Sequence, residues 1–128
     1  MKIDDPATLT EVRAVFDAYE RAFVANDITA LDGFFLHAPT TIRYGAGDMQ
    51  LGMEQLRAYR QSVAPVGLER ELRDIVITSY GTDFAIASTL FFRDRVPGKT
   101  GRQMQSWIRT PEGWRIVAAH VSVIADPA

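Results

Sequence analysis

The sequence predicts an α+β fold in which three helices pack on a strongly curved antiparallel sheet. Apolar residues recur at three- and four-residue steps over the first half of the chain and at two-residue steps from residue 69 onwards. Helices that are segregated from hairpin-linked strands are typical of α+β proteins. Because strands of about twelve residues in a small sheet must twist and coil, we expect a cone with a cavity at its open end. We expect residues 1–128 to form a single domain.

A long N-terminal helix is predicted to begin at Asp5-Pro6, where an N-cap side chain precedes a proline at the first helical position. Apolar side chains from Leu9 to Phe23 follow at helical spacing and give the helix one apolar face. Asn26-Asp27 ends it, and Asp27 can cap a second, shorter helix. That helix carries four apolar side chains: Ile28, Leu31, Phe34 and Phe35.

Two short strands and a third helix come next. Thr40–Tyr44 and Gln50–Gly52 are predicted to form the strands, with a glycine-containing turn between them. Met53–Val63 is predicted to form the third helix, which ends near Pro65 and Gly67.

Four long strands complete the predicted sheet. Their connections at 81–83, 96–99 and 110–113 contain glycine, proline or aspartate, as hairpin turns do. The strands are Glu69–Tyr80, Phe84–Arg95, Arg102–Thr110 and Trp114–Ala125.

The last hairpin predicts which side chains share a face of the sheet. If Arg109 pairs with Trp114, residues that lie opposite each other across the strands share a face. One face then mixes aromatic, amide, hydroxyl and imidazole groups: Gln103, Gln105, Trp107, His120 and Ser122, with Ser88, Leu90 and Phe92. The other face is apolar: Met104, Ile108, Val117, Ala119, Val121 and Val123. Since ligand pockets combine apolar walls with a few placed polar groups, we assign the mixed face to the pocket.

The apolar face predicts either an ordinary core or a subunit interface. Val117, Val121 and Val123 would expose a large apolar patch on a monomer, so we expect a homodimer through the sheet.

The composition excludes several classes of function. The absence of cysteine excludes disulfides, thiolate metal sites and cysteine nucleophiles. A net charge of -2 does not suit a protein that binds the nucleic-acid backbone. We find neither a signal peptide nor a run of roughly 20 apolar residues that could cross a membrane, and therefore expect a cytoplasmic protein. Two histidines without an acidic partner at ligand spacing predict no metal site.

Arg43 is the most unusual residue in the pattern, because it lies inside the short β-prone segment Thr40–Gly45. An arginine that points into a cone is unfavourable unless it meets an anion, and its planar guanidinium matches a carboxylate. The inward orientation predicts a site for a small anionic substrate. The alternative is an outward arginine paired with a surface acid.

Three other residues have both a chemical and a structural interpretation. Tyr19 lies on the apolar face of the first helix and could donate a proton to a ligand, or it could be a core tyrosine bonded to a backbone carbonyl. His120 is either a satisfied residue of an apolar strand or an acid/base group. His37 is expected to be exposed. Four arginines are predicted to form a solvated face, with Arg60 able to reach the pocket mouth: Arg57, Arg60, Arg70 and Arg73.

Several segments together resemble the AtzH/HpxZ family over nearly the whole chain. The most specific is the C-terminal hairpin, with Gly-Arg-Gln-Met-Gln-Ser-Trp at 101–107 and Gly-Trp-Arg-Ile-Val-Ala-Ala-His-Val-Ser at 113–122. The others are Arg43-Tyr44-Gly45, Gly52 and Tyr59-Arg60. The resemblance implies a SnoaL-like, cystatin-like fold, which is also called nuclear-transport-factor-like.

The resemblance also implies a function beside amidases in the breakdown of ureido compounds. The AtzH branch implies decarboxylation of 1,3-dicarboxyurea to allophanate in cyanuric acid degradation, and the HpxZ branch implies a step in oxalurate and purine catabolism. Tyr19 and Arg43 occupy the places of the functional tyrosine and arginine of the AtzH branch. We expect these two residues to be catalytic, and expect four others to bind the substrate: Gln105, Trp107, His120 and Ser122.

We therefore expect a carboxy-lyase, or a hydrolase, that acts on a small ureido carboxylate without a metal or organic cofactor. One alternative is a non-catalytic binding protein or an accessory protein of a partner amidase. Another is hydrolysis or isomerisation in a sibling pathway such as oxalurate breakdown.

Overall fold

The computed structural model describes residues 1–64 and 67–126, which contain three helices and six strands. The helices are α1 (Pro6–Val24), α2 (Ile28–Gly33) and α3 (Met53–Ser62). The strands are β1 (Ile42–Tyr44), β2 (Met49–Leu51), β3 (Glu71–Tyr80), β4 (Phe84–Phe92), β5 (Lys99–Thr110) and β6 (Gly113–Ala125). The expected number of helices is confirmed. Pro65, near which the third helix was expected to end, lies outside the described residues.

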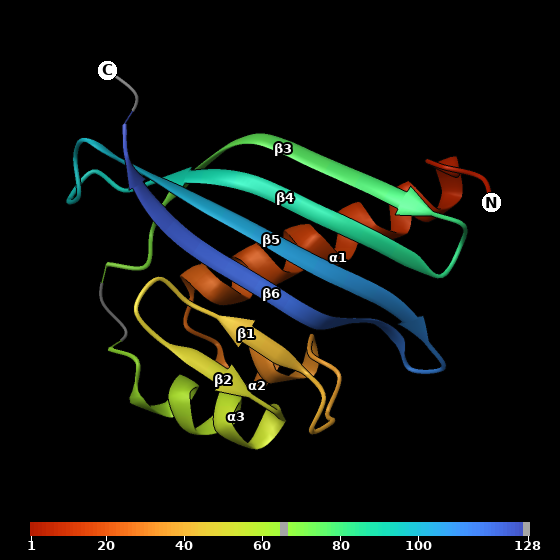
Figure 1. The fold of residues 1–128 in the computed structure, drawn as a ribbon, viewed down its shortest axis with the longest axis horizontal. Helices are drawn as coiled ribbons and strands as arrows, with labels where there is room; N and C mark the ends of the chain where they lie inside the picture. The colour runs from red at the N-terminus through yellow and green to blue at the C-terminus, as the bar shows by residue number, and fades with distance from the viewer. Residues whose placement is uncertain (65–66, 127–128) are drawn as a thin grey trace.

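The six strands form one mixed sheet in the order β2-β1-β6-β5-β4-β3. The prediction of an antiparallel sheet is wrong at one place, because β1 runs parallel to β6, with Ile42 opposite Ala118. Parallel pairing needs a long connection, and the chain from 45 to 112 supplies it. The sheet is open, with β2 and β3 at its edges. Helix α1 lies across one face, which we call the inner face (Figure 1).

Helix α1 contributes one stripe of side chains to the core. Val12, Phe16 and Tyr19 are buried at four- and three-residue spacing, as the apolar pattern predicts. They pack against inner-face side chains of the central strands, among them Ala85, Ala87, Trp107 and Ile116. Large aromatic side chains dominate this core, and their packing fixes the position of α1 on the sheet.

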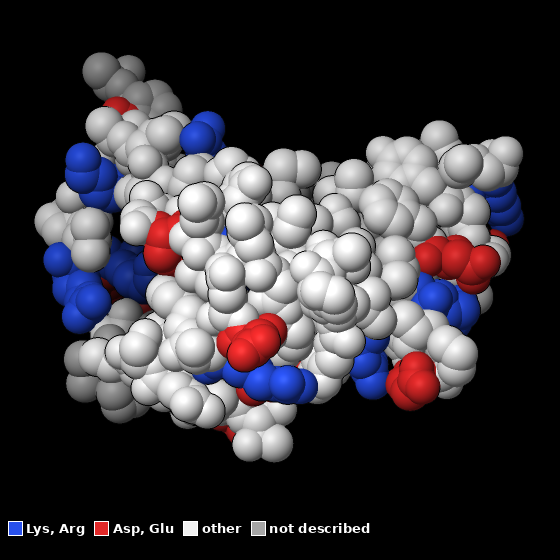
Figure 2. Space-filling view, turned by 60° about the horizontal axis from the view of Figure 1, so that its bottom comes forward, with Lys and Arg blue, Asp and Glu red and all other residues white. Residues whose placement is uncertain are grey.

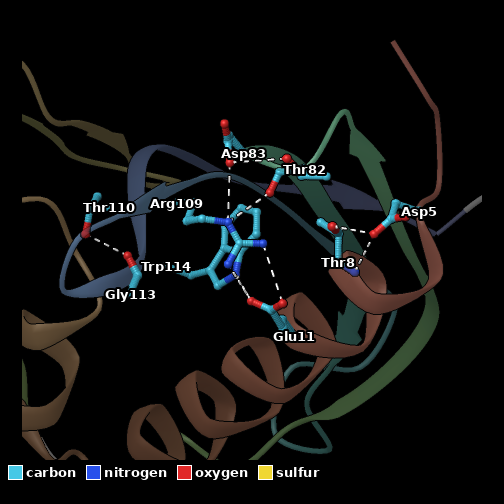
Figure 3. Close-up of polar contacts among 9 residues, drawn as sticks. All are labelled: Asp5, Thr8, Glu11, Thr82, Asp83, Arg109, Thr110, Gly113 and Trp114. Carbon is cyan, nitrogen blue, oxygen red and sulfur yellow. Dashed lines mark hydrogen bonds and ion pairs between the residues drawn. The ribbon is translucent and has the colours of Figure 1, made fainter.

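The N-terminal half of α1 is fixed to the β5–β6 hairpin by polar contacts (Figure 3). The Asp5 carboxylate caps the helix by accepting a hydrogen bond from the Thr8 N–H at 3.1 Å. Further along, Glu11 accepts from Arg109 Nη1 at 2.7 Å and from Trp114 Nε1 at 3.0 Å. These bonds from Arg109 and Trp114 hold the pKa of the Glu11 carboxyl below its ordinary value. This end of the helix–sheet interface is closed by the protein's own side chains.

A bulge in β6 sets which side chains face α1. Trp107 pairs with Ile116 as predicted, but the next pair is Ser106 with Ala118, so Val117 is an extra residue in the strand. One extra residue turns every later side chain of the strand to the other face.

The bulge corrects the face assignment made from the sequence. His120 is exposed on the outer face, and Ser122 lies on that face too. The inner face of β6 beyond the bulge is apolar instead: Ala119, Val121 and Val123. The register of β4 on β5 also differs from the prediction, although that pairing is regular: Phe91 lies opposite Gly101 on the inner face. Three residues that were assigned to the pocket therefore lie on the outer face: Ser88, Leu90 and Phe92.

Within residues 1–64 and 67–126, no helix combines the length and the apolar composition that crossing a bilayer requires.

Candidate functional site

A cavity of about 220 Å³ lies beside the C-terminal half of α1. Its walls come from α1, α2, β1 and the β1–β2 turn, α3, the segment before β3, and the strands β4, β5 and β6. The cavity lining includes four arginines from four separate segments of the chain: Arg43, Arg60, Arg70 and Arg93. Figure 2 shows basic side chains gathered at one end of the molecule, on the left of that view. The cavity is therefore suited to an anion.

Arg43 points to the inner side of the sheet. Its strand alternates exposed and buried side chains, with Arg43 only 9% exposed between Ile42 and Tyr44. The guanidinium Nη1 donates to Asp48 Oδ1 at 2.9 Å and to Gln50 Oε1 at 3.0 Å. Within the described ranges its Nε and Nη2 atoms have no hydrogen-bond partner, and neither is fully enclosed by protein. These two atoms can donate to a ligand, whereas a purely outward arginine is excluded.

Asp48 keeps the Arg43 guanidinium in place. Burial would raise the pKa of the Asp48 carboxyl, but hydrogen bonds from Gln50, the charge of Arg43 and a bond from Tyr59 outweigh it, and the pKa lies below its ordinary value. The Arg43 guanidinium also lies 4.9 Å from the centre of the Tyr59 ring. Charge and stacking therefore fix the orientation of Arg43 before any ligand binds.

Tyr19 lines the same cavity. Its ring is buried between the edges of Phe34 and Phe35, at centroid distances of 5.9 and 6.2 Å. Its hydroxyl oxygen accepts a hydrogen bond from Arg60 Nη2 at 3.2 Å. No acceptor for the Tyr19 proton lies within reach in the part of the chain that the structure describes, so a bond to a backbone carbonyl is not what satisfies it.

The charges around Tyr19 favour its ionised form. Burial alone would raise the pKa of the phenol, but the positive charges of Arg60, Arg43 and Arg70 and the hydrogen bond from Arg60 outweigh burial. The pKa of Tyr19 is therefore below the ordinary value of about 10. A phenol in this state transfers its proton more readily than a free tyrosine does.

Arg60 was assigned to the solvated face, and the structure corrects this. It is 5% exposed, and its guanidinium lies 5.5 Å from the centre of the Phe35 ring. The signal was present in the sequence, because Met53, Leu56 and Arg60 recur at the three- and four-residue spacing of a buried helix face.

Arg70 is the second buried arginine that sequence reasoning missed. Its side chain is 2% exposed and forms a two-pronged ion pair with Glu20, with the shortest contact at 2.6 Å. It also donates to Gln103 at 3.0 Å and lies 4.1 Å from the Phe23 ring centre. The other two members of the predicted solvated face, Arg57 and Arg73, are exposed as expected. So is His37, which contacts Arg57.

Arg93 adds a further positive charge just beyond β4. Its pKa is lowered by burial and by repulsion from Arg70 and Arg95. Its guanidinium lies 5.0 Å from the centre of the Phe91 ring, and among the described residues its buried Nε has no partner. Across the whole cavity, four guanidiniums meet two carboxylates, those of Asp48 and Glu20. The imbalance favours a ligand that carries more than one negative charge.

The four residues predicted to bind the substrate lie in different parts of the structure, and none of them lines the cavity. Gln105 and Trp107 face inward and are fully buried, and Trp107 Nε1 donates to Gln105 Oε1 at 3.1 Å. They belong to the core beneath the cavity rather than to its lining, which Gln103 reaches instead. His120 and Ser122 are wrong as pocket residues, because the bulge at Val117 turns them outward. His120 meets the edge of Tyr44, and Ser122 accepts from Arg102 Nε at 3.0 Å.

The described ranges, 1–64 and 67–126, contain no group of three His, Cys, Asp or Glu side chains that could hold a metal ion. The polar groups of the cavity are dominated by guanidinium donors, which bind oxyanions rather than cations.

Helices on one face of an open mixed sheet, with a cavity between them, define a protein of the cystatin-like, or NTF2-like, fold. The sequence matches the AtzH-like family over residues 1–127. The chain therefore belongs to the AtzH-like family, and the resemblance seen in the sequence is confirmed.

Solved structures agree with this assignment. A protein of unknown function from Pectobacterium atrosepticum is 49% identical, with a TM-score of 0.94 over 96% of this chain and 95% of that chain. A cystatin-like fold protein from Burkholderia xenovorans is 49% identical, with a TM-score of 0.95 over 99% of each chain. An NTF2-like protein from Pseudomonas putida shares the fold alone, at 18% identity and a TM-score of 0.77 over 92% of this chain and 87% of that one. Among curated proteins, no relative matches. Family and fold point to a protein that binds or converts a small molecule.

Proposed function

We propose that this protein is a cytoplasmic, cofactor-independent carboxy-lyase that removes carbon dioxide from a 1,3-dicarboxyurea-type substrate in the catabolism of cyanuric acid or related ureides. One observation carries the proposal: the open nitrogens of Arg43 and the unpaired hydroxyl proton of Tyr19 line the same cationic cavity, among the residues that the structure describes. Membership of the AtzH-like family supports it.

Arg43 holds the carboxylate that stays on the substrate. A carboxylate that leaves as carbon dioxide loses its charge, so a cation fixed on it would stabilise the reactant more than the transition state. The adjacent N–H groups of Nε and Nη2 can bind both oxygens of a carboxylate that remains charged throughout the reaction. Arg43 thus orients the substrate, with Asp48 and Gln50 fixing the guanidinium from behind.

Tyr19 supplies the proton that the reaction needs. The bond between the departing carboxylate carbon and the urea nitrogen breaks, and its electron pair goes to the nitrogen. The Tyr19 hydroxyl gives its proton to that nitrogen, carbon dioxide leaves, and the resulting phenolate regains a proton from water. The charges of Arg60, Arg43 and Arg70 stabilise the phenolate between these steps.

The two negative charges of the substrate suit the cavity. Arg43 comes from β1, whereas Arg93 follows β4, and β6 and β5 lie between those strands in the sheet. The guanidiniums therefore approach the ligand from different walls, and a molecule with an acid group at each end can use both. Gln103 and Tyr59 provide neutral polar groups between them for the ureido core.

The test is an assay of carbon dioxide and ammonia released from 1,3-dicarboxyurea, allophanate and oxalurate, with the uncatalysed rates subtracted. We expect carbon dioxide from 1,3-dicarboxyurea, with allophanate as product and no ammonia. Ammonia from allophanate or oxalurate would identify a hydrolase and contradict the proposal. Binding without any turnover would also contradict it, and would favour an accessory protein of an amidase.

We propose further that the outer face of the sheet forms a homodimer interface. Its apolar side chains differ from those expected, because Val121 and Val123 face the cavity. The outer face exposes Met104, as expected, and it also exposes Ile42, Tyr44, Met49 and Leu51; Met49 is 65% and Met104 52% exposed. Figure 2 shows a broad central area with few charged side chains. We expect two-subunit mass in equilibrium sedimentation and one-subunit mass for Met104→Glu; one-subunit mass for the natural protein would refute the interface.

A further inference from the structure

The hydrogen bond between Arg60 and Tyr19 fixes the direction of the Tyr19 hydroxyl. A guanidinium can only donate, so the Tyr19 oxygen must accept at the 3.2 Å contact. A phenol O–H prefers to lie in the plane of its ring, which leaves two orientations, and the Arg60 N–H occupies the acceptor position of one of them. The proton therefore takes the other orientation. Among the described residues no side chain or carbonyl accepts it there, so it faces the cavity that Tyr19 lines.

We infer that Arg60 is a positioning residue that holds the Tyr19 hydroxyl so that its proton points at the bound ligand, and this inference rests on the proposed function. It concerns a residue of α3 that the sequence pattern places with Met53 and Leu56 on the buried face of the helix. Arg60 acts through Tyr19, whereas Arg43 acts on the substrate.

The burial of Arg60 is difficult to explain by stability alone. Its Nε is enclosed and has no partner within residues 1–64 and 67–126. A buried cation with an unsatisfied donor is destabilising, and an apolar side chain of similar length would pack against Phe35 and Leu56 at lower cost. A role in the cavity, where Arg60 bonds to Tyr19, accounts for a charge that stability alone does not explain.

Arg60 also differs from the other cations near Tyr19. Three arginines act on the phenol, Arg60, Arg43 and Arg70. The Asp48 carboxylate pairs with Arg43 and the Glu20 carboxylate with Arg70, so both charges are partly neutralised. In the described part of the chain, Arg60 forms no ion pair with a carboxylate and makes a direct hydrogen bond to the phenol. Its charge has the largest effect on Tyr19 because it is the closest and the least compensated.

The test is a spectroscopic titration of tyrosinate absorbance, which needs no substrate. The chain has four tyrosines, and the Tyr19→Phe variant identifies which step belongs to Tyr19. We expect Arg60→Met to move that step to higher pH, toward or beyond the value of about 10 for free tyrosine. Arg57→Met, on the exposed face of the same helix, should leave the step unchanged. Arg60→Lys keeps the charge and should restore part of the shift. Near-ultraviolet circular dichroism establishes that each variant is folded.

Kinetics with the substrate of the proposed function gives the second readout. We expect Arg60→Met to lower kcat at least about tenfold and to raise KM less than Arg43→Met does, because the proton donor is misplaced while the Arg43 site is intact. An unchanged Tyr19 titration in folded Arg60→Met and Arg60→Lys would overturn the inference. So would a shifted titration with unchanged kcat. If the natural protein has no decarboxylase activity while the titration shifts as described, the proposed function fails and the Arg60–Tyr19 coupling stands.

Discussion

The ion pair between Glu20 and Arg70 is the interaction under the cavity whose loss we expect to cost most. The Arg70 side chain is 2% exposed, and Glu20 accepts three hydrogen bonds from it, at 2.6, 2.9 and 3.3 Å. Glu20→Gln keeps the shape of the side chain and removes the charge. It leaves a buried guanidinium without an opposing charge, whose partners are the one remaining acceptor oxygen at position 20, Gln103 and the faces of Phe23 and Phe91.

The magnitude follows from these contacts. Breaking a buried ion pair by removing one partner costs about 3–5 kcal/mol, and the remaining aromatic and amide contacts of Arg70 offset part of it, so we expect a loss of about 2–3 kcal/mol. For a chain of 128 residues this corresponds to a fall in Tm of about 10 °C. Urea and thermal unfolding followed by circular dichroism measure it.

Two further variants separate this effect from a general loss of charge. Glu71→Gln removes the acid of an exposed pair with Arg73, whose side chains are 63% and 55% exposed, and should cost less than about 0.5 kcal/mol. The double variant Glu20→Gln/Arg70→Met should recover most of the stability, because it leaves no unpaired buried charge. Equal small losses for Glu20→Gln and Glu71→Gln would refute the reasoning, as would a double variant that is no more stable than Glu20→Gln.

Three other predictions concern the cavity. Arg43→Lys should lose most of the turnover in the carbon dioxide assay, because one ammonium cannot replace the two N–H groups that bind a carboxylate side by side. Near-normal turnover of this variant would show that bidentate binding by Arg43 is not part of the mechanism. Because the pKa of Tyr19 is lowered on folding, the unfolded chain keeps this proton at a higher pH than the folded one, and the free energy of unfolding should rise with pH between the folded pKa and about 10. Tyr19→Phe should lack that rise in urea titrations at several pH values, and a slope identical to that of the natural protein would contradict the lowered pKa. Gly101→Ala should cost about 1–3 kcal/mol, since its Cβ would lie 2.2 Å from the Phe91 ring, whereas Gly33→Ala meets no atom within 4 Å and should be neutral or slightly stabilising in the same unfolding assay.

The helices and most strands follow from local patterns in the sequence. Asp5 and Pro6 specify where α1 begins, and burial alternates along the whole of β4 and along β5 from Gly101 to Ile108. The parallel pairing of β1 with β6 could not be predicted, because it joins segments far apart in the chain and the three residues of β1 carry no signal for a particular neighbour.

The face of β6 could not be predicted for a different reason. The bulge at Val117 lies within a continuous apolar run, without the glycine or proline that often marks an irregularity. A single extra residue moved His120 and Ser122 out of the pocket and Val121 and Val123 into it. The half of the hairpin before the bulge kept its predicted register, and Trp107 therefore faces inward as expected.

The burial of the arginines could be predicted from the sequence only in part. Arg43 was found because its strand is short and otherwise uncharged. Arg60 continues the three- and four-residue spacing of the buried face of α3, so its burial could have been read from the sequence. It was missed because arginine counts as polar in any hydropathy pattern. Arg70 precedes β3 and has no periodicity of its own, and only its contact with Glu20, 50 residues away in the chain, reveals it.

The most direct test of the account is calorimetric titration with malonate, a stable dicarboxylate that cannot undergo the proposed reaction at a urea nitrogen. If the cavity is a carboxylate site built on Arg43, the natural protein binds malonate, and Arg43→Met binds it at least about 30-fold more weakly, while Arg57→Met binds it normally. Equal affinity of the natural protein and Arg43→Met for malonate would contradict the account.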